Sequence, residues 1–385
     1  MSRFLSKTSK ALLPYTPGEQ PQGVKLIKLN TNESPYPPSP NVARALLQGF
    51  KGCEWDAAAA KNADAAGGDE ALSLMPPEIA NLRLYSDPEE KPLMKAIADY
   101  YGVDSDQVIG GNGSDEILAF AFKAFCDEEA PLLSADITYG FYPALCQLFG
   151  IPYRTAALRE DFSIDIEDYK NCGCNVIIAN PNAPTGMAMP LSAIEEVLSS
   201  NPDRVVMVDE AYVDFGCESA VTLLDRYENL VVIQTFSKSR SLAGGRVGFA
   251  VASKELIADM NRAKYSFNPY NVNRLSMLAA AEAMKDKEYT KLCTGKIQKT
   301  RERTAQALTQ LGFTVLPSKT NFIFAKCNAM SGKEYFDGLR RNNILVRRWD
   351  TEKIREYLRI SIGTDEEMDI FLEVTKKLLS EKEAE

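Results

Sequence analysis

The order of the hydrophobic segments constrains the fold of this chain most. Between residue 87 and about residue 252, amphipathic helical stretches alternate with short, β-branched, apolar runs. This alternation is typical of a mostly parallel sheet that is covered by helices on both faces. Residues 273–312 are then predicted to form one or two long helices, followed by strand-like runs and a last helix. These runs lie at residues 321–325, 344–347 and 357–362. The sequence therefore predicts a large α/β domain followed by a smaller α+β domain.

Polar residues follow two of the apolar runs directly. Asp209 comes after the run 204–208, and Tyr212 lies three residues further on. Asn182 lies in a Pro-Asn-Ala-Pro-Thr-Gly turn after the run 175–180. Open α/β sheets bind ligands beyond the carboxyl ends of their strands, so these side chains are expected to share a site. Taken singly, each has a structural explanation, because a strand-end Asp and a turn of this composition are common in any protein.

A lysine with unusual surroundings stands in Thr-Phe-Ser-Lys-Ser-Arg-Ser-Leu-Ala-Gly-Gly-Arg-Val-Gly-Phe, residues 235–249. A strand-like run leads into Ser237 and Lys238, and Arg246 follows eight residues later. A lysine at a strand end can form a Schiff base with a cofactor, and a hydroxyl group together with an arginine can hold its phosphate. The alternative is a surface lysine in a basic turn. Gly244 and Gly245 favour the ligand site, because glycine lets the backbone approach a ligand closely.

Glycines also precede a predicted helix, in Val-Ile-Gly-Gly-Asn-Gly-Ser-Asp-Glu-Ile at residues 108–117. The free backbone N–H groups at a helix amino terminus bind phosphate well. Gly113, Ser114 and Asp115 are therefore candidates for a phosphate site. Asp115 and Glu116 also suit the positive end of the helix dipole, and capping alone would explain them.

Composition excludes several classes of function. The chain has 385 residues, of which 45% are hydrophobic and 25% charged, as in a soluble globular protein. Its net charge of −9 gives no expectation of nucleic-acid binding, and no apolar run reaches the ~20 residues that span a membrane. The absence of histidine excludes Ser-His-Asp, Cys-His and His-metal mechanisms. Eight scattered cysteines favour reduced thiols, a cytoplasmic protein and no metal.

Taken in order, these segments resemble the fold type I pyridoxal-phosphate aminotransferases of class I and II. The closest likeness is to the branch that contains the histidinol-phosphate aminotransferases, and it covers nearly the whole chain. The Lys238 run and the Asn-Pro-Asn-x-Pro-Thr-Gly run at 180–186 are typical of the superfamily. Other stretches indicate the branch, and they lie at residues 12–18, 29–35, 84–88, 138–142 and 358–364.

The resemblance implies a role for each candidate residue toward pyridoxal 5'-phosphate. Lys238 would form the Schiff base and move the proton, and Asp209 would hold the pyridinium N–H. Tyr212 and Asn182 would contact the ring oxygen, and Tyr139 would stack on the ring, although this aromatic could simply belong to the core. The phosphate would be held by Gly113, Ser114, Asp115, Ser237 and Arg246.

The resemblance also assigns residues to a substrate and to a second subunit. Tyr85 matches a tyrosine that reaches the cofactor phosphate of a partner subunit, which implies a homodimer. Arg359 matches an arginine that binds a substrate carboxylate with two hydrogen bonds. Arg347, Tyr15 and Asn32 are expected to help with a phosphorylated substrate. Arg347 has an alternative as half of a solvated Arg347–Arg348 pair, and Tyr15 could merely anchor the amino-terminal arm.

The implied organisation is an amino-terminal arm that packs with the small domain, a large cofactor-binding domain and the small domain itself. The expected bounds are 1–40, 41–272 and 273–385. Residues 51–80 depart from the family pattern and are interpreted as an insertion on the surface.

The expected reaction converts L-histidinol phosphate and 2-oxoglutarate to imidazole-acetol phosphate and L-glutamate, in histidine biosynthesis. The alternatives are a threonine-phosphate decarboxylase and an aminotransferase for aromatic or other amino acids. A pyridoxal-phosphate-dependent transcription regulator would need some ~70 residues for a helix-turn-helix. The arm before Leu29 is too short for such a domain.

Overall fold

The computed structural model describes residues 5–6, 9, 11–21, 26–48 and 81–384. Its large domain contains a seven-stranded sheet with the order β2-β8-β7-β6-β5-β3-β4. Strand β8 is antiparallel to both of its neighbours, whereas the other pairs are parallel. The strands are β2 (Val108–Gly111), β3 (Leu132–Ala135), β4 (Tyr153–Ala156), β5 (Asn175–Ala179), β6 (Val206–Asp209), β7 (Leu230–Thr235) and β8 (Gly248–Ala252). The predicted mostly parallel sheet is confirmed.

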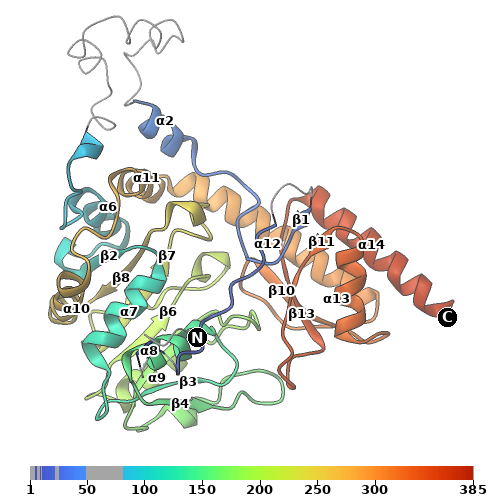
Figure 1. Ribbon diagram of the computed structural model, residues 1–385, viewed down its shortest axis with the longest axis horizontal. Helices are drawn as coiled ribbons and strands as arrows, with labels where there is room; N and C mark the ends of the chain where they lie inside the picture. The colour runs from blue at the N-terminus through green and yellow to red at the C-terminus, as the bar shows by residue number, and fades with distance from the viewer. Residues whose placement is uncertain (1–4, 7–8, 10, 22–25, 49–80, 385) are drawn as a thin grey trace, which may run out of the picture.

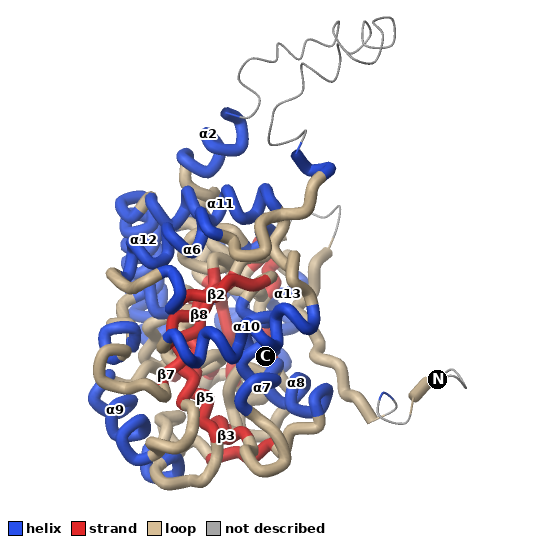
Figure 2. Tube along the Cα trace, turned by 90° about the vertical axis from the view of Figure 1, so that its left-hand side faces the viewer, coloured by secondary structure: helices blue, strands red, loops and turns tan. Residues whose placement is uncertain are grey.

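Helices cover both faces of this sheet, because neighbouring side chains of a strand point in opposite directions. Val206 and Val208 of β6 pack in one core with the helices of the first face, whereas Met207 packs in a second core with those of the other face. The first face carries α6 (Lys91–Tyr101), α9 (Leu191–Ser200) and α11 (Arg274–Lys285), and the second carries α7 (Ser114–Phe125), α8 (Phe141–Phe149) and α10 (Lys254–Phe267). Figure 2 shows α9 on one side of strands β5 and β7, and α7 and α8 on the other.

The small domain is built on an antiparallel sheet with the order β12-β13-β10-β9. Its apolar side chains form a separate core with three helices. The elements are β9 (Phe313–Val315), β10 (Phe322–Cys327), β12 (Arg347–Arg348) and β13 (Tyr357–Ser361), with α12 (Lys287–Gln310), α13 (Gly332–Arg341) and α14 (Asp365–Glu383). Among the described residues, no helix combines the length and the apolar character that crossing a membrane requires.

Helix α11 packs on the large domain, although the expected division assigned it to the small domain. The division put residue 273 and everything after it in the small domain, but α11 contacts α6 and α2 (Pro40–Gln48). Its buried residues Met277 and Met284 belong to the core of the large domain. The change from one core to the other falls between Met284 of α11 and Ile297 of α12, the helix that runs between the two domains (Figure 1). An apolar helix face does not reveal from the sequence which neighbour covers it.

The amino-terminal arm connects the two domains. Strand β1 (Ile27–Lys28) pairs in parallel with β11 (Ile344–Leu345), and Leu29 is buried in the core of the small domain. Further toward the amino terminus, the backbone N–H of Leu13 donates to the side chain of Gln147 in α8. The arm therefore passes over the space between the domains. The expected insertion at 51–80 lies outside the described residues.

Candidate active site

A cavity of about 400 Å³ opens at the carboxyl ends of β5, β6 and β7, where the arm and the small domain face the large domain. It brings together most of the residues that the sequence singled out. Those that line it are Tyr15, Asn32, Ser114, Asp115, Tyr139, Asp209, Tyr212, Ser237, Lys238, Arg246, Arg347 and Arg359. Gly113, Asn182 and Tyr85 do not line it.

Lys238 is held at the centre of the cavity by the arm. Its Nζ donates a hydrogen bond to the carbonyl oxygen of Thr31 at 3.1 Å and lies 5.9 Å from the centroid of the Tyr212 ring. Burial, followed by the charge of Arg359, lowers the pKa of Lys238 to about 8, against the opposing charges of Glu33 and Asp115. A substantial fraction of this amine is therefore neutral near physiological pH, as a nucleophile or a base requires.

The low pKa of Lys238 predicts a pH-dependent contribution to stability. Between pH 8 and pH 10.5 the unfolded chain keeps a proton on this lysine that the folded protein has lost. The stability of the cofactor-free wild type relative to a Lys238→Met variant should therefore rise with pH across this window. The total rise should be about 3 kcal/mol, because one pKa unit corresponds to ~1.4 kcal/mol. Denaturant unfolding at several pH values measures it, and a constant difference would contradict the low pKa.

Asp209 ends strand β6 with its carboxylate buried in the floor of the cavity. The hydroxyl of Tyr142 donates to Oδ2 at 2.7 Å, and the backbone N–H of Ala211 donates to Oδ1 at 3.1 Å. Burial raises the pKa of Asp209 to about 6 in spite of these two bonds. An anion that is this costly to bury is stabilised by a cationic N–H beside it. The site thus fits the pyridinium nitrogen of the expected cofactor.

Tyr212 is oriented by Asn32 from the arm. The side-chain amide of Asn32 donates to the Tyr212 oxygen at 2.9 Å, and its carbonyl accepts from the hydroxyl of Ser361 at 2.8 Å. Because the phenol oxygen already accepts this hydrogen bond, its own hydrogen is available to donate into the cavity. This is the donor that a ring oxygen of the cofactor would need.

The amino terminus of α7 borders the cavity through Ser114 and Asp115. Gly113 precedes the helix with φ of 81°, and a Cβ there would lie 2.4 Å from Nη2 of Arg246. A Cβ on Gly248 of β8 would lie 2.3 Å from the backbone nitrogen of Ser114. The two glycines therefore allow Arg246 and β8 to approach the free N–H groups of the helix. Gly113 thus serves the site by leaving space.

Asp115 connects Arg246, beside the amino terminus of α7, to Tyr139. Its carboxylate accepts a hydrogen bond from the hydroxyl of Tyr139 at 2.9 Å and from Arg246 Nη2 at 3.3 Å. The ring of Tyr139 meets the ring of Tyr15 edge to face, with centroids 5.9 Å apart. Tyr139 is thereby fixed as a wall of the cavity, where a flat ring can lie against it.

Asn182 has other partners than the expected ring oxygen. Its amide donates to the carbonyl of Ile137 at 3.0 Å and to the hydroxyl of Thr185 at 3.2 Å, and its oxygen accepts from Thr138 at 2.7 Å. The bonds with Ile137 and Thr138 hold the loop that follows β5 against the loop that follows β3, and the bond with Thr185 lies within the loop that follows β5. A contact with the cofactor would require the amide to leave these partners.

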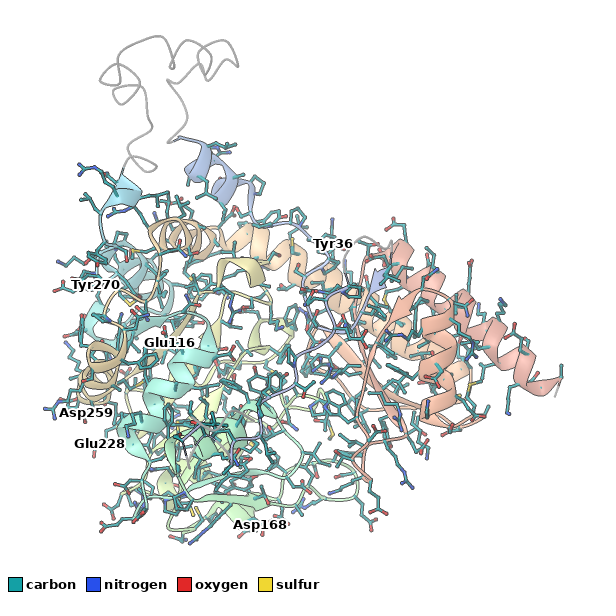
Figure 3. The ribbon with its side chains drawn as sticks, viewed as in Figure 1. Tyr36, Glu116, Asp168, Glu228, Asp259 and Tyr270 are labelled. Carbon is teal, nitrogen blue, oxygen red and sulfur yellow. The ribbon has the colours of Figure 1, made fainter. Side chains whose placement is uncertain are left out.

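Tyr85 lies on the surface of the large domain, and 79% of its area is exposed. Its ring stacks on Tyr270 with centroids 4.5 Å apart, and its carbonyl accepts a hydrogen bond from Arg274. Figure 3 shows Tyr270 at the outer side of the large domain, far from the small domain. Tyr85 therefore does not reach the cavity of its own chain.

Arg347 and Arg359 are direct neighbours across the antiparallel pair of β12 and β13. Nη2 of Arg359 donates to the carbonyl of Asn30 at 2.9 Å, while its buried Nε has no hydrogen-bond partner among the described residues. Arg347 donates to the carbonyls of Thr16 and Pro17 at 3.0 and 3.3 Å. In the described part of the chain, the acceptors of both guanidinium groups are carbonyls of the arm rather than carboxylates. This end of the cavity is therefore suited to a bound anion.

Several residues of the site were not singled out from the sequence. They lie close in the chain to residues that were. Thr31 and Glu33 belong to the arm stretch 29–35, but their proximity to Lys238 is a tertiary contact. Tyr142 lies at the end of the stretch 138–142, and its hydroxyl supports Asp209. Trp349 lies two residues after Arg347, and this period-two spacing could have placed it on the same face of the strand.

Comparison with known proteins gives the family. The family of aminotransferases of class I and II matches residues 24–374. Histidinol-phosphate aminotransferase of Clostridium botulinum (strain Langeland) is 48% identical over 380 residues, 99% of each chain. The enzyme of that name from Acinetobacter baumannii is 48% identical over 365 residues, 95% of this chain and 94% of its own.

A solved structure agrees with the fold. The crystal structure of histidinol-phosphate aminotransferase from Sinorhizobium meliloti in complex with pyridoxal-5'-phosphate has a TM-score of 0.82, at 23% identity and 99% coverage of both chains. Together with the match of the family over nearly the whole length, these relatives show that the chain belongs to the aminotransferases of class I and II.

Proposed function

We propose that this enzyme transfers the amino group of L-glutamate to imidazole-acetol phosphate, and catalyses the reverse reaction from L-histidinol phosphate and 2-oxoglutarate. One observation carries the proposal. A single cavity combines a lysine of low pKa, a buried strand-end aspartate and two arginines whose acceptors among the described residues are carbonyls rather than carboxylates. The relatives that match the chain over its whole length bear the name of this activity.

The cofactor of the reaction is pyridoxal 5'-phosphate, and the described residues fit it. When bound, it supplies an electron sink for the charge that is left as the substrate loses its α-proton. Asp209 would hold the ring nitrogen, Tyr212 would donate to the ring oxygen, and Tyr139 would lie against the ring. The phosphate would be held by Ser114, Ser237 and Arg246 at the amino terminus of α7.

Lys238 moves the proton. Its amine lies in the same cavity as Asp209 and Tyr212, and its pKa of about 8 allows it both to accept and to return a proton near neutral pH. No histidine exists in the chain to take this part. The carbonyl of Thr31 keeps Nζ directed at the cavity while the lysine is free.

The two arginines receive the anionic end of the substrate. Histidinol phosphate has a phosphate ester at the position where glutamate has its α-carboxylate, so one site must accept two anions of different charge. Arg359, with its unpartnered buried Nε, can bind a carboxylate alone. Arg347 adds the second charge that a phosphate dianion requires.

Arg347→Ala should therefore weaken the binding of histidinol phosphate by roughly 1.5–3 kcal/mol, the usual value of a hydrogen bond to a charged group. Glutamate should be affected much less. The measurement is the KM of each substrate, and Arg348→Ala is the matched control. Arg348 lies next in sequence but pairs with Asp350 at 2.6 Å and does not line the cavity. Equal losses for both substrates after Arg347→Ala would contradict the assignment of the phosphate.

The proposed reaction is tested by turnover of the purified enzyme on several substrates side by side. Histidinol phosphate, phosphothreonine, phenylalanine and aspartate are compared, and both amino transfer and release of CO₂ are recorded. Fastest amino transfer from histidinol phosphate is expected. Decarboxylation of phosphothreonine would instead indicate a lyase, and preference for phenylalanine or aspartate would indicate an aminotransferase of another specificity.

We propose further that the enzyme is a cytoplasmic homodimer. The exposed Tyr85 stacks on Tyr270, and Phe267 close by in the sequence is also 79% exposed. Such an aromatic surface is typical of an interface between subunits. The cysteines among the described residues are free thiols, in keeping with a reducing compartment.

Mixing two inactive variants should restore activity if Tyr85 completes the site of a partner subunit. Tyr85→Ala changes an exposed side chain and should leave the fold intact, whereas Lys238→Ala removes the reacting amine. A mixed dimer then contains one site with both defects and one with neither. Activity should rise above the sum of the two separate variants after subunit exchange. Proven exchange without recovery would show that each site is complete within one chain.

A further inference from the structure

Trp349 lies beside both arginines at the end of the cavity that would receive the anionic group of the substrate. Its ring centroid is 5.5 Å from Cζ of Arg347 and 5.3 Å from Cζ of Arg359. Arg347 and Arg359 are paired across β12 and β13, and Trp349 follows Arg347 by two residues. All three side chains line the cavity. One indole ring thus contacts both guanidinium groups from the same face of the sheet.

The contact offsets an unfavourable arrangement of charge. Like charges directly opposite each other on an antiparallel pair repel. Burial and the charge of Arg347 both lower the pKa of Arg359, with burial the larger cause. The faces of aromatic rings carry partial negative charge and attract guanidinium groups within about 6 Å. The ring therefore stabilises two neighbouring cations where the described structure supplies them with carbonyls rather than carboxylates.

The two arginines depend on this ring to different degrees. Arg359 has a second aromatic neighbour, since its Cζ lies 5.5 Å from the centroid of Phe322. Its Nε is also buried, and its Nη2 is anchored to the carbonyl of Asn30. Arg347 has Trp349 and two carbonyls of the arm, and it lies closer to solvent. Loss of the ring should therefore displace Arg347 more than Arg359.

We propose that Trp349 is a specificity-determining residue that holds Arg347 and Arg359 side by side as a receptor for a dianion. A carboxylate needs one guanidinium group, which Arg359 supplies without the ring. A phosphate monoester presents two negative charges and three oxygens and uses both groups. The ring thus selects for the phosphorylated substrate over glutamate. This inference rests on the proposed function.

The alternative is that Trp349 only fills space. It packs at the edge of a small apolar cluster that includes Phe324 and Ile354. A residue of that kind would affect both substrates equally, or would affect only stability. The two possibilities therefore differ in the ratio of the effects on the two substrates.

The test compares a variant that keeps the ring with variants that remove it. Trp349→Phe keeps an aromatic face, whereas Trp349→Met keeps an apolar side chain without one. Trp349→Leu replaces Trp349→Met if the melting temperature of the latter falls far below that of the wild type. The KM and kcat of the cofactor-loaded enzymes are measured for histidinol phosphate and for glutamate. In the ring-free variant the KM for histidinol phosphate should rise on the order of tenfold. The KM for glutamate and the kcat values for both substrates should change less than about threefold. Trp349→Phe should stay near the wild type.

A binding measurement separates this inference from the proposed function. Calorimetry follows the binding of inorganic phosphate and of acetate to the same cofactor-loaded proteins. If the ring-free variant loses affinity for phosphate but not for acetate, this supports the role of Trp349 in the dianion receptor. That conclusion holds even if the wild type fails to transaminate histidinol phosphate. Parallel changes for phosphate and acetate, or for histidinol phosphate and glutamate, would overturn the role of Trp349. Absence of turnover of histidinol phosphate by the wild type would overturn only the proposed reaction.

Discussion

Lys238→Ala should reduce amino transfer on the order of 10⁴-fold, the upper range for loss of a group that moves the proton in the reaction. The variant should remain folded, because Nζ makes only one described hydrogen bond, to the carbonyl of Thr31. It should also still bind pyridoxal phosphate, since Asp209, Tyr212 and the amino terminus of α7 are unchanged. Single-turnover kinetics and cofactor binding, measured on the same preparation, test both parts of this expectation.

A second buried lysine provides the control for this prediction. Lys264 is more deeply buried than Lys238, but its Nζ pairs with the carboxylate of Glu90 at 2.7 Å, outside the cavity. This amine is engaged by Glu90 and does not line the cavity that fits the cofactor. Borohydride reduction of the wild type should thus fix the cofactor on Lys238 and leave Lys264 unmodified. Peptide mapping that finds the label on another lysine, or substantial turnover by Lys238→Ala, would refute the assignment.

Asp209→Asn should lower kcat on the order of 10³-fold, as loss of a buried group that stabilises charge commonly does. An amide has nearly the shape of a carboxylate and can still accept the hydrogen bond from Tyr142. It lacks the negative charge that keeps a pyridine nitrogen protonated. The effect should therefore fall on kcat more than on the KM for either substrate. Steady-state kinetics on a variant shown to be fully loaded with cofactor provide the measurement.

The neighbouring residue is a matched control for the role of Asp209. Glu210 is equally buried, and burial raises its pKa to about 7. Its carboxylate accepts from Ser219, from the backbone of Ala220 and from Gln234 at 2.6, 2.6 and 2.9 Å, away from the cavity. Glu210→Gln should therefore change kcat only a few-fold. Similar losses for the two variants would mean that burial of a carboxylate, rather than its place beside the cofactor, matters for activity.

The sequence alone determined the sheet and its functional edge. Strands β5, β6 and β7 are apolar on both faces, and a buried parallel sheet requires this pattern. Their polar residues follow at the carboxyl ends, and parallel pairing necessarily brings these ends together. Asp209 and Lys238 could therefore be assigned to one site before any contact was known. The glycines before α7 predicted a phosphate site from the sequence, but only the structure shows that Gly113 leaves space for Arg246.

Only the tertiary structure decided which partner each polar group takes. The amide of Asn182 had several possible acceptors within reach of its turn, and it bonds to Ile137 and Thr185 rather than facing the cavity. The apolar face of α11 could have packed on either domain, and it packs on α6. Such choices depend on the positions of distant segments, which the local pattern of a sequence does not contain.

The arm and the arginine pair show most clearly which features the sequence determines and which the tertiary structure decides. The sequence placed Asn32, Arg347 and Arg359 in separate stretches and assigned them to a site only through resemblance. The register of β12 and β13 sets Arg347 opposite Arg359, and the path of the arm directs Thr31 at Lys238. The sequence determined which chemical groups were available and which strand ends carry them. The packing of the arm and the small domain against the large domain decided the distances between those groups, and hence the pKa of Lys238 and the charge that the substrate meets.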